Sequence, residues 1–359
     1  MGANFPKAAR AGAASTSIAT NLSIDPVQTS EFENTSSETK RASHNDDAVQ
    51  HDTHNPAPRY RSFDAALSAA RETIDARLDS LFQKTREPAR LTCAIRHGLL
   101  SPGKRLRPLI TTFAGEQFGA PLSVTIDAAC AVEMVHAASL IMDDLPAMDD
   151  ARMRRGNVAT HVVFGEGTGM LATIALLNEA FRLVGQTPGA SSDRRLRALN
   201  HLTAAIGPDG LAGGQEKDIA CDGAENCMTD MEHRHHQKTG ALFSAAAAMG
   251  AELAEADAQS IHAMIEYGRA LGLAYQAFDD VLDCSASEND IGKDVMQDEG
   301  KSTVVTILGK EGARAQCRRW LNRAREIAET VGVGGPSAPL ALFVGKLDRK
   351  FAVKIGEFA

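Results

Sequence analysis

Two groups of aspartates are the most distinctive chemistry-bearing feature of this 359-residue sequence. The first lies in "SLIMDDLPAMDD" and the second in "YQAFDDVLD"; their members are Asp143, Asp144 and Asp149, and Asp279, Asp280 and Asp283. Acidic side chains usually occupy solvated helix faces, but these adjoin apolar residues typical of buried helices. Carboxylate oxygens without His or Cys suit a hard cation such as Mg²⁺, which proteins typically share between a few carboxylates and a phosphate. We therefore interpret the two groups together as a metal and phosphate site.

Cationic residues in other stretches could complete such a site. "SPGKRLRP" contains Lys104 and Arg107, three apart on an expected helical face, and "ARMRRG" contains Arg154 and Arg155. The guanidinium fork matches phosphate oxygens bidentately, and Lys adds a point charge. Two Gly-punctuated, loop-like stretches, "HHQKTG" and "GKDVMQDEGKST", contribute Lys238, Thr239, Lys293 and Lys301. The pattern predicts two phosphate-binding sites, one bridged by metal ions and one held by cations alone.

A helix is expected to carry the first aspartates. "AVEMVHAASLIM" has helical spacing and places His136 seven residues before Asp143, two turns away on the same face. Pro146 lacks an N–H and clashes with the preceding turn, so the helix should break there. An irregular turn after the break could bring Asp149 back towards Asp143.

The second group is expected on another helix. Gln276, Asp279 and Asp283 are three and four residues apart, so they should share one helical face. Like charges at this spacing destabilise an isolated helix by a few tenths of a kcal/mol. A compensating cation is therefore expected near this face.

Composition predicts how these helices are organised. Residues 58–359 are rich in Ala and Leu with helical spacing, which predicts one large all-α domain of roughly 300 residues. Residues 1–57 are polar and lack an apolar period, which is typical of a disordered arm. The net charge of −8 offers no basic footprint for nucleic acid.

Location and redox state follow from similar arguments. The six cysteines form no CxxC pair, which fits reduced thiols in the cytoplasm. No apolar run approaches the roughly 18 residues of a transmembrane span. The N-terminus has no acid before Asp25 and faintly resembles an organelle transit peptide, which stays a minor alternative. His233, His235 and His236 lack the further ligands of a zinc site, so a solvated helix end is the preferred interpretation.

Six stretches together resemble the trans-isoprenyl diphosphate synthases in order and approximate spacing. They are "GKRLRP", "DDLPAMDDARMRRG", "GGQEKD", "KTG", "YQAFDDVLD" and "GKDVMQDEGKST". The resemblance covers roughly residues 60–350 and is greatest to the geranylgeranyl diphosphate synthases of bacterial carotenoid pathways. It implies an all-helical fold around a deep central cavity, a homodimer, and dependence on Mg²⁺, with Mn²⁺ as an alternative.

The resemblance also implies a role for each matching residue. The metal ions that hold the allylic diphosphate would be bound by Asp143, Asp144, Asp149, Asp279, Asp280 and Asp283. Arg154 would contact the allylic diphosphate. Isopentenyl diphosphate would be bound by Lys104, Arg107, His136 and Arg155. The groups that close around the diphosphates and the forming carbocation would be Lys238, Thr239, Gln276, Lys293 and Lys301.

The expected reaction condenses isopentenyl diphosphate with dimethylallyl, geranyl or farnesyl diphosphate to give geranylgeranyl diphosphate and diphosphate. Farnesyl and longer-chain synthases stay open as alternatives of the same class. A terpene cyclase is the alternative of a different class, but "DDVLD" differs from the Asn/Asp, Ser/Thr, Glu motif of those enzymes. A non-catalytic partner subunit would be expected to lack one aspartate group, and both are intact here.

Product length is expected to depend on Ala138 and Ser139, about one turn before Asp143. Both are small, whereas an aromatic residue tends to fill the earlier position in farnesyl-producing relatives, so a C20 product is expected. Alternatively, both are small because two helices pack closely there. Ala172 and Thr173 stand where many members carry a Gly-Asp pair, which carotenoid-pathway members also tend to lack.

Overall fold

The computed structural model describes residues 62–82, 88–220, 227–284 and 303–357. The expected arm over residues 1–57 lies outside these ranges, and so do Lys293 and Lys301. Within the described part the chain is almost entirely helical, and the only strands are β1 (Met153–Arg154) and β2 (Asn157–Val158). The predicted all-α class is confirmed.

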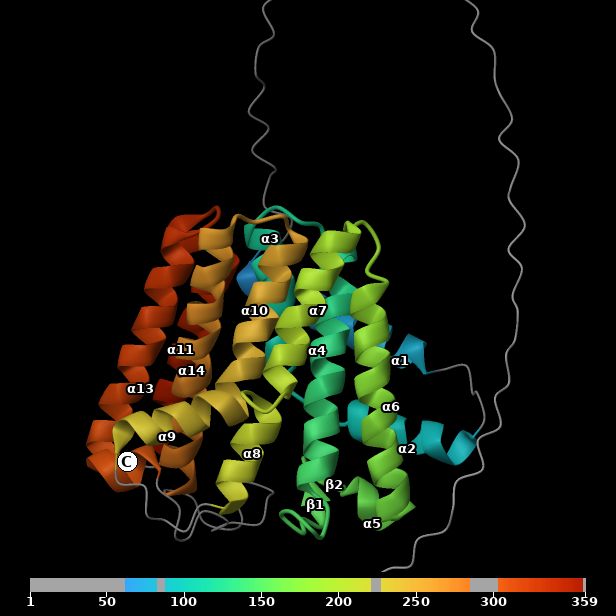
Figure 1. Cartoon of the computed structure of the whole chain (residues 1–359). Coiled ribbons are helices and arrows are strands. Elements are labelled where there is room, and N and C mark those ends of the chain that lie inside the picture. Colours follow the sequence, from blue (N-terminus) through green and yellow to red (C-terminus); the bar gives the residue numbers. More distant parts are fainter. Residues whose placement is uncertain (1–61, 83–87, 221–226, 285–302, 358–359) are drawn as a thin grey trace, which may run out of the picture. The chain divides into compact units, whose positions relative to one another are not determined.

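The helices form a bundle in which most elements run side by side (Figure 1). In chain order the helices are α1 (Phe63–Leu81), α2 (Ala89–Leu99), α3 (Leu106–Gln117), α4 (Leu122–Asp143), α5 (Thr160–Phe164), α6 (Glu166–Gly185), α7 (Ser192–Ile206), α8 (Leu211–Ala220), α9 (Met228–His235), the π-helix η1 (His236–Gly240), α10 (Ala241–Leu253), α11 (Ala258–Asp283), α13 (Val304–Thr330), the short 3₁₀-helix η2 (Gly335–Ser337) and α14 (Pro339–Glu357).

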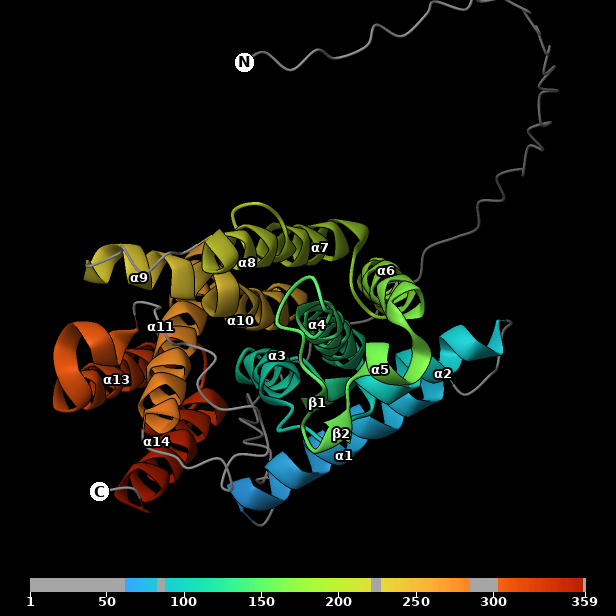
Figure 2. The same ribbon diagram turned by 90° about the horizontal axis from the view of Figure 1, so that it is seen from below.

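Helices α3, α4 and α10 lie in the middle of the bundle when it is seen from below (Figure 2). Helix α4 packs against α1, α2, α3, α6 and α10, which explains its Ala-rich, nearly unbroken apolar sequence. It is long and apolar enough to cross a membrane by composition, but 72% of its most apolar window is buried inside the protein. Helix α4 is therefore a core helix, as its position requires.

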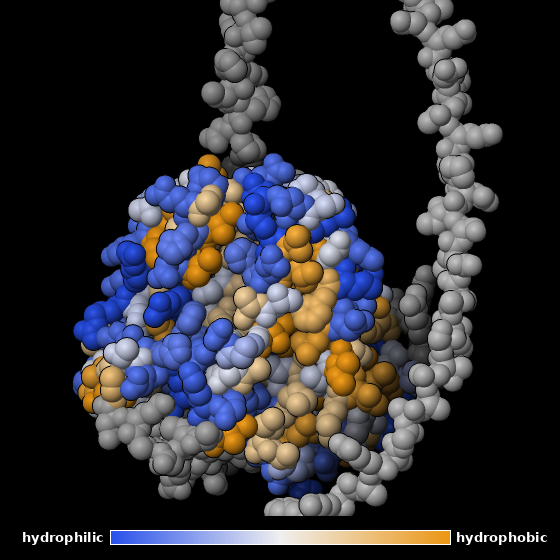
Figure 3. Space-filling model, in the orientation of Figure 1, coloured by the Kyte–Doolittle hydropathy of each residue, from blue (hydrophilic) through white to orange (hydrophobic). Residues whose placement is uncertain are grey.

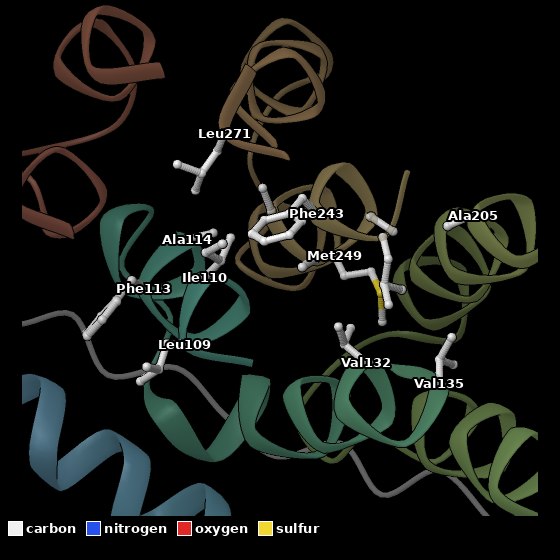
Figure 4. Packing of buried hydrophobic residues seen from close by; sticks show 14 of the residues in the cluster. Leu109, Ile110, Phe113, Ala114, Val132, Val135, Ala205, Phe243, Met249 and Leu271 are labelled. Atoms are coloured by element: carbon white, nitrogen blue, oxygen red, sulfur yellow. The ribbon is translucent and has the colours of Figure 1, made fainter. Parts of the chain in front are cut away.

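The hydrophobic core fills the space between these central helices. Ile110 and Ala114 of α3 face Phe243 of α10, whereas Leu109 and Phe113 point away from α10 (Figure 4). All five side chains are at most 2% exposed. The core therefore fixes the relative positions of the helices whose ends carry the candidate site.

Glycines allow the closest helix contacts beside the site. A Cβ on Gly268 of α11 would lie 2.4 Å from the Cα of Ser244 in α10. A Cβ on Gly272, one turn further along α11, would lie 2.6 Å from the Cα of Gly240 in η1. These contacts leave no room for a side chain, so η1 lies directly against α11 and the two elements share one wall of the site.

Candidate active site

A cavity of about 600 Å³ opens between α1, α3, α4, α11, α14 and the β1–β2 hairpin. One part of its wall carries Lys104, Arg107, His136 and Arg155, which we call the cationic pocket. Another part of the wall carries Thr239, Gln276, Asp279 and Asp283. With Arg154, nine residues that the sequence predicted as functional, from five different segments, thus line one cavity.

Arg105 fixes the loop from which the cationic pocket projects. Its backbone is left-handed, with φ of 49°, a conformation that is uncommon for a residue other than glycine. The guanidinium is 5% exposed and donates from Nε to Asp75 Oδ1 at 2.7 Å and from Nη1 to Glu133 Oε1 at 2.6 Å. Because both carboxylates belong to core helices, α1 and α4, this ion-pair network stabilises the strained turn.

The prediction that Lys104 and Arg107 share one helical face is wrong. Helix α3 begins only at Leu106, and the left-handed Arg105 redirects the chain before it. Lys104 therefore precedes the helix while Arg107 lies in its first turn. Both side chains still line the cavity, because the turn at Arg105, and not a helix, directs them there.

Aromatic rings orient the two cations. The ammonium of Lys104 donates to the Tyr275 hydroxyl at 2.7 Å and lies 5.2 Å from the centre of that ring. The Arg107 guanidinium lies 4.5 Å from the centre of the Phe243 ring. Burial lowers the pKa of Arg107 to about 10, so it stays protonated at neutral pH. Cations stacked on ring faces are attracted without being neutralised, which leaves their charge available to an anion.

The hairpin delivers Arg155 to His136. Arg155 and Gly156 form the two-residue turn between β1 and β2, and both have positive φ, as type I′ turns require. Arg155 Nη2 lies 2.9 Å from His136 Nε2. Arg can only donate, so Nε2 must accept and the imidazole proton must be on Nδ1. Burial, followed by Arg107 and Arg155, lowers the pKa of His136 well below its usual value.

The first acidic cluster, Asp143, Asp144 and Asp149, forms where α4 ends. Helix α4 stops at Asp143, three residues before Pro146, and the Asp149 N–H donates to the Asp143 carbonyl at 2.9 Å. The predicted break and the return of Asp149 towards Asp143 are both confirmed. Burial is the main cause that raises the pKa of Asp143 to about 6, and the neighbouring Asp149 and Asp144 carboxylates add to it.

Cations next to this cluster are already engaged by carboxylates. Arg154 Nε donates to Asp144 Oδ1 at 2.7 Å, and Asp144 is only 3% exposed. Lys238 forms an ion pair with Asp218 of α8. Lys238 is also the largest opposing influence on the pKa of Asp143, which places its charge close to that carboxylate. An anionic ligand at this end of α4 could contact Arg154 and Lys238 only beside, or in place of, their present carboxylate partners.

The π-helix η1 brings Lys238 and Thr239 to the site. A Cβ on Gly214 of α8 would lie 2.4 Å from the backbone nitrogen of Lys238, so α8 and η1 are in backbone contact. This close approach explains Gly214, the second glycine of "GGQEKD", whereas a Cβ on Gly213 would meet the Pro208 carbonyl oxygen at 1.7 Å. π-Helical turns are rare and occur frequently at functional sites, because they re-aim side chains within a helix.

The second acidic cluster, Asp279, Asp280 and Asp283, divides between two directions. Asp279 and Asp283 line the cavity, whereas Asp280 does not and is 2% exposed. Gln276 connects this cluster to η1, because the Thr239 hydroxyl donates to Gln276 Oε1 at 3.0 Å. The predicted common face of Gln276, Asp279 and Asp283 is confirmed, since all three line the cavity.

The donor set has the chemistry of a Mg²⁺ site that needs a substrate. Within the described ranges, no three His, Cys, Asp or Glu side chains converge closely enough to hold an ion by themselves. The solvated helix end expected for the three histidines is wrong for His235, which is 8% exposed at the end of α9. Mg²⁺ commonly binds through one or two carboxylates together with waters and substrate phosphates. Asp279 and Asp283 at the cavity wall fit that mode, whereas Asp143, Asp144 and Asp149, at the end of α4, are not among the residues that line the cavity.

Comparison with known proteins identifies the family. Residues 88–331 match the family described as "Polyprenyl synthetase". This chain belongs to the polyprenyl synthetase family. It is 39% identical over 255 residues to the geranylgeranyl diphosphate synthase of Pantoea ananas, a match that covers 70% of this chain and 83% of that protein. It is 36% identical over 265 residues to the farnesyl diphosphate synthase of Bacillus subtilis (strain 168), covering 73% of this chain and 90% of the relative.

A solved structure agrees with this assignment. The geranyltransferase from Legionella pneumophila superposes with a TM-score of 0.72 at 25% identity, and the match covers 81% of this chain and 98% of the other. This polyprenyl synthetase is therefore a prenyltransferase of isoprenoid biosynthesis, as the sequence motifs predicted.

Further cations of this polyprenyl synthetase line the cavity and were missed in the sequence. They are Arg71 on α1 and Lys346, Lys350 and Lys354 on α14. Burial lowers the pKa of Lys350, and the nearby Lys104 and Lys354 lower it further. The spacing of the three lysines, four residues apart, could have revealed a common helical face. The lysines of α14 therefore add positive charge to the wall of the cavity beside the cationic pocket.

The two positions expected to control product length do not line this cavity. Ala138 is 1% exposed and belongs to the hydrophobic core, while Ser139 is half-buried and its hydroxyl donates to the His136 carbonyl at 2.9 Å. Ala172 and Thr173, where many members have Gly-Asp, are buried on α6, which packs against α4.

Proposed function

We propose that this polyprenyl synthetase is a Mg²⁺-dependent geranylgeranyl diphosphate synthase. It would condense isopentenyl diphosphate with an allylic diphosphate, up to a C20 product. The observation that carries the proposal is one cavity with two chemically different walls: the cationic pocket, and the wall formed by Thr239, Gln276, Asp279 and Asp283. A reaction between two diphosphate esters, only one of which must ionise, needs such a division.

The cationic pocket is assigned to isopentenyl diphosphate. Its cations contact Tyr275, Phe243 and a neutral His136, and the carboxylate beside them, Glu133, is ion-paired with Arg105. A diphosphate can therefore bind there as an anion without a metal. This substrate must keep its diphosphate, so a site that does not activate the C–O bond is appropriate.

The allylic diphosphate is assigned to the acidic side. Asp143, Asp149, Asp279 and Asp283 would hold Mg²⁺, which supplies charge neutralisation for the leaving diphosphate. Lys238 adds positive charge beside Asp143. Arg154 is included in this site because it adjoins Asp144, although its present partner is that carboxylate. Asp144 would accordingly act by holding Arg154 in position. Lys293 and Lys301 are included in this site only because of the family resemblance.

The chain's own residues then direct the reaction. Heterolysis of the allylic C–O bond gives a delocalised carbocation, and the oxygen atoms of Thr239 and Gln276 would stabilise it from the cavity wall. The isopentenyl double bond attacks this cation, forming the new C–C bond. The resulting cation loses a proton, which the released diphosphate accepts. No side chain has to act as a nucleophile, and positioning supplies most of the catalysis.

The C20 product is supported by small residues and by relatives. Ala138 and Ser139 leave no aromatic ring before Asp143, and relatives named as geranylgeranyl diphosphate synthases include those of Pantoea ananas and Pseudescherichia vulneris. A relative named as a farnesyl diphosphate synthase is about equally similar, so C15 is the principal alternative. Carotenoid biosynthesis in the cytoplasm is the proposed context, and it rests on the resemblance of the motifs.

A homodimer is also proposed. Helix α6 exposes Met170, Leu171 and Ile174, whose exposed fractions are 44%, 56% and 63%. Figure 3 shows hydrophobic surface over the part of the molecule where Figure 1 labels α6. A row of large apolar side chains at helical spacing is typical of a surface that a partner covers. The mass in solution at micromolar concentration tests this part, and a monomer would overturn it.

One assay tests the activity. The purified protein is incubated with isopentenyl diphosphate, Mg²⁺ and dimethylallyl, geranyl or farnesyl diphosphate in turn, and the dephosphorylated products are separated by chain length. A C20 alcohol from every starter supports the proposal, and C15 as the end product overturns the chain length. A cyclic hydrocarbon formed without isopentenyl diphosphate would instead indicate a terpene cyclase.

A further inference from the structure

Helical geometry separates the three aspartates of the second acidic cluster. Successive residues of an α-helix are rotated by about 100°, so Asp279 and Asp283 can share a face that Asp280 cannot share. The structure follows this rule, because Asp279 and Asp283 line the cavity while Asp280 is buried on the side of α11 that faces α13. The sequence motif alone does not distinguish the three carboxylates.

Both carboxylate oxygens of Asp280 accept hydrogen bonds from groups of known position. Oδ1 accepts from Gln276 Nε2 at 3.1 Å, and Oδ2 accepts from the backbone N–H of Val304 at 3.0 Å. Val304 is the first residue of α13, so the carboxylate also lies at the positive end of that helix. Asp280 thereby joins α11 to α13 and fixes one end of Gln276.

This contact determines how the Gln276 amide is oriented. A carboxylate only accepts, so the Gln276 NH₂ group must face Asp280 and its carbonyl oxygen must face Thr239. The Thr239 hydroxyl donates its single proton to that carbonyl at 3.0 Å. What Thr239 can then offer to the cavity is the lone pairs of its oxygen. Since Thr239 and Gln276 both line the cavity, the wall presents the negative ends of two dipoles.

We propose that Asp280 is a positioning residue that orients Gln276 and Thr239 towards the forming carbocation, and that it is not a Mg²⁺ ligand. The inference corrects the role that the family resemblance implied for Asp280, and it rests on the proposed prenyl transfer. Its physical basis is preorganisation: dipoles held in place before the reaction stabilise developing positive charge without a reorganisation cost. A flipped amide would present the positive NH₂ end instead.

Metal binding is measured first, with Asp279→Asn as the matched control. Calorimetric titration of Mg²⁺ and inorganic diphosphate into each protein reports binding without turnover. Asp279→Asn should weaken this binding by about tenfold or more, because it removes a charged oxygen ligand. Asp280→Asn should change it by less than about threefold, while kcat falls by about 10²-fold through misplacement of the wall. Equal weakening of binding in both variants would overturn the inference.

A compensating variant tests the direction of the hydrogen bonds. In the double variant Asp280→Asn with Gln276→Glu, the amide NH₂ at position 280 can donate to the carboxylate at position 276. The amide oxygen at position 280 can still accept from the Val304 N–H, and the Thr239 hydroxyl still has a carboxylate oxygen at position 276 to donate to. The double variant should recover kcat at least about tenfold relative to Asp280→Asn, a coupling expected only for interacting partners. Failure to recover any activity in a folded double variant would contradict the relay.

A third variant leaves both side chains intact and covers the case in which Asp280→Asn does not fold. Val304→Pro removes the N–H that donates to Asp280 Oδ2 and also replaces a side chain that is 0% exposed in the core; the first position of a helix tolerates proline. We expect kcat to fall about three- to tenfold with unchanged binding of Mg²⁺ and diphosphate. Wild-type kcat would show that the tether to α13 is irrelevant. If the wild-type protein makes no prenyl product, the proposed function fails, whereas calorimetry still decides whether Asp280 is a ligand.

Discussion

The cationic pocket and the acidic clusters differ in how complete they are without substrate. In the cationic pocket, Lys104, Arg107 and Arg155 are already oriented by Tyr275, Phe243 and His136. The acidic clusters lie at the ends of two helices, α4 and α11, and the described side chains form no ready-made metal cage. On the proposed function, the cationic pocket would be built in advance for a diphosphate, while the acidic site would be completed only when a diphosphate brings Mg²⁺ with it.

Under the proposed function, this difference would let one cavity treat two similar diphosphate esters differently. A preformed pocket binds its diphosphate with little rearrangement and gives the bonded carbon no electrophilic activation. A site that assembles around metal and diphosphate concentrates positive charge on the leaving group only when the correct ligand is present. The variants below should affect one side of this division and spare the other.

The largest effect is expected on the acidic side. Asp143→Asn should lower kcat/KM by about 10³-fold or more, because a charged oxygen ligand for Mg²⁺ is removed while the shape is kept. Asp150→Asn is the matched control: its backbone is left-handed, with φ of 48°, which Asn also tolerates. Circular dichroism should show the same helix content for both. Near-normal turnover of Asp143→Asn would remove the metal assignment from this cluster.

The next effect concerns the cationic pocket. Arg107→Ala should raise the KM for isopentenyl diphosphate by about 10- to 100-fold, because a charge-assisted contact of about 1.5–3 kcal/mol is lost. The KM for the allylic substrate should change little. Arg152→Ala, an exposed arginine near the hairpin, serves as the control. If the allylic KM rises instead, the two diphosphate sites have been exchanged.

Those features of the two sites that depend on local sequence could be predicted. The end of α4 follows from Pro146, and the shared face of Gln276, Asp279 and Asp283 follows from helical spacing. The identification of the prenyltransferase family followed from six motifs in order.

The remaining parts depend on contacts between distant segments. The left-handed turn at Arg105 is stabilised by Asp75 and Glu133, which are 30 and 28 residues away in sequence. The burial of Asp280 depends on α13, whose first N–H it accepts. Helical spacing alone could not reveal these partners, because a carboxylate in a DDxxD pattern looks the same whether it faces a cavity or a neighbouring helix.

The third prediction concerns where the growing prenyl chain lies, on the acidic side or on the side of the cationic pocket. Ala138→Tyr places a ring about one turn before Asp143, below the acidic side, and should shift the main product from C20 to C15. Because Ala138 is 1% exposed in the core, this overpacking should also cost about 1–3 kcal/mol of stability. Ala138→Ser is the small control and should keep the C20 product. An active Ala138→Tyr variant that still makes C20 would show that the growing chain lies elsewhere.

The smallest effect tests the charge state of the cationic pocket. Burial and the adjacent arginines hold the pKa of folded His136 well below the value near 6.5 that it has when unfolded. Below pH 6.5 the unfolded chain therefore binds a proton that the folded protein does not bind. The free energy of unfolding must then fall as the pH falls, by up to about 1.4 kcal/mol per pH unit for this residue.

The measurement compares urea unfolding of the wild type and His136→Gln at pH 5.5, 6.5 and 7.5. Gln can still accept from Arg155, so the pocket keeps its hydrogen bond but loses the titrating group. His235, whose pKa burial lowers to about 3, contributes equally to both proteins and cancels in the difference. The wild type should therefore lose more stability than the variant between pH 6.5 and 5.5, and the two should run parallel above pH 7. Parallel curves throughout would mean that the pKa of His136 is the same in the folded and unfolded states, so that His136 would be protonated in the folded protein below pH 6.5 and could not accept from Arg155 there.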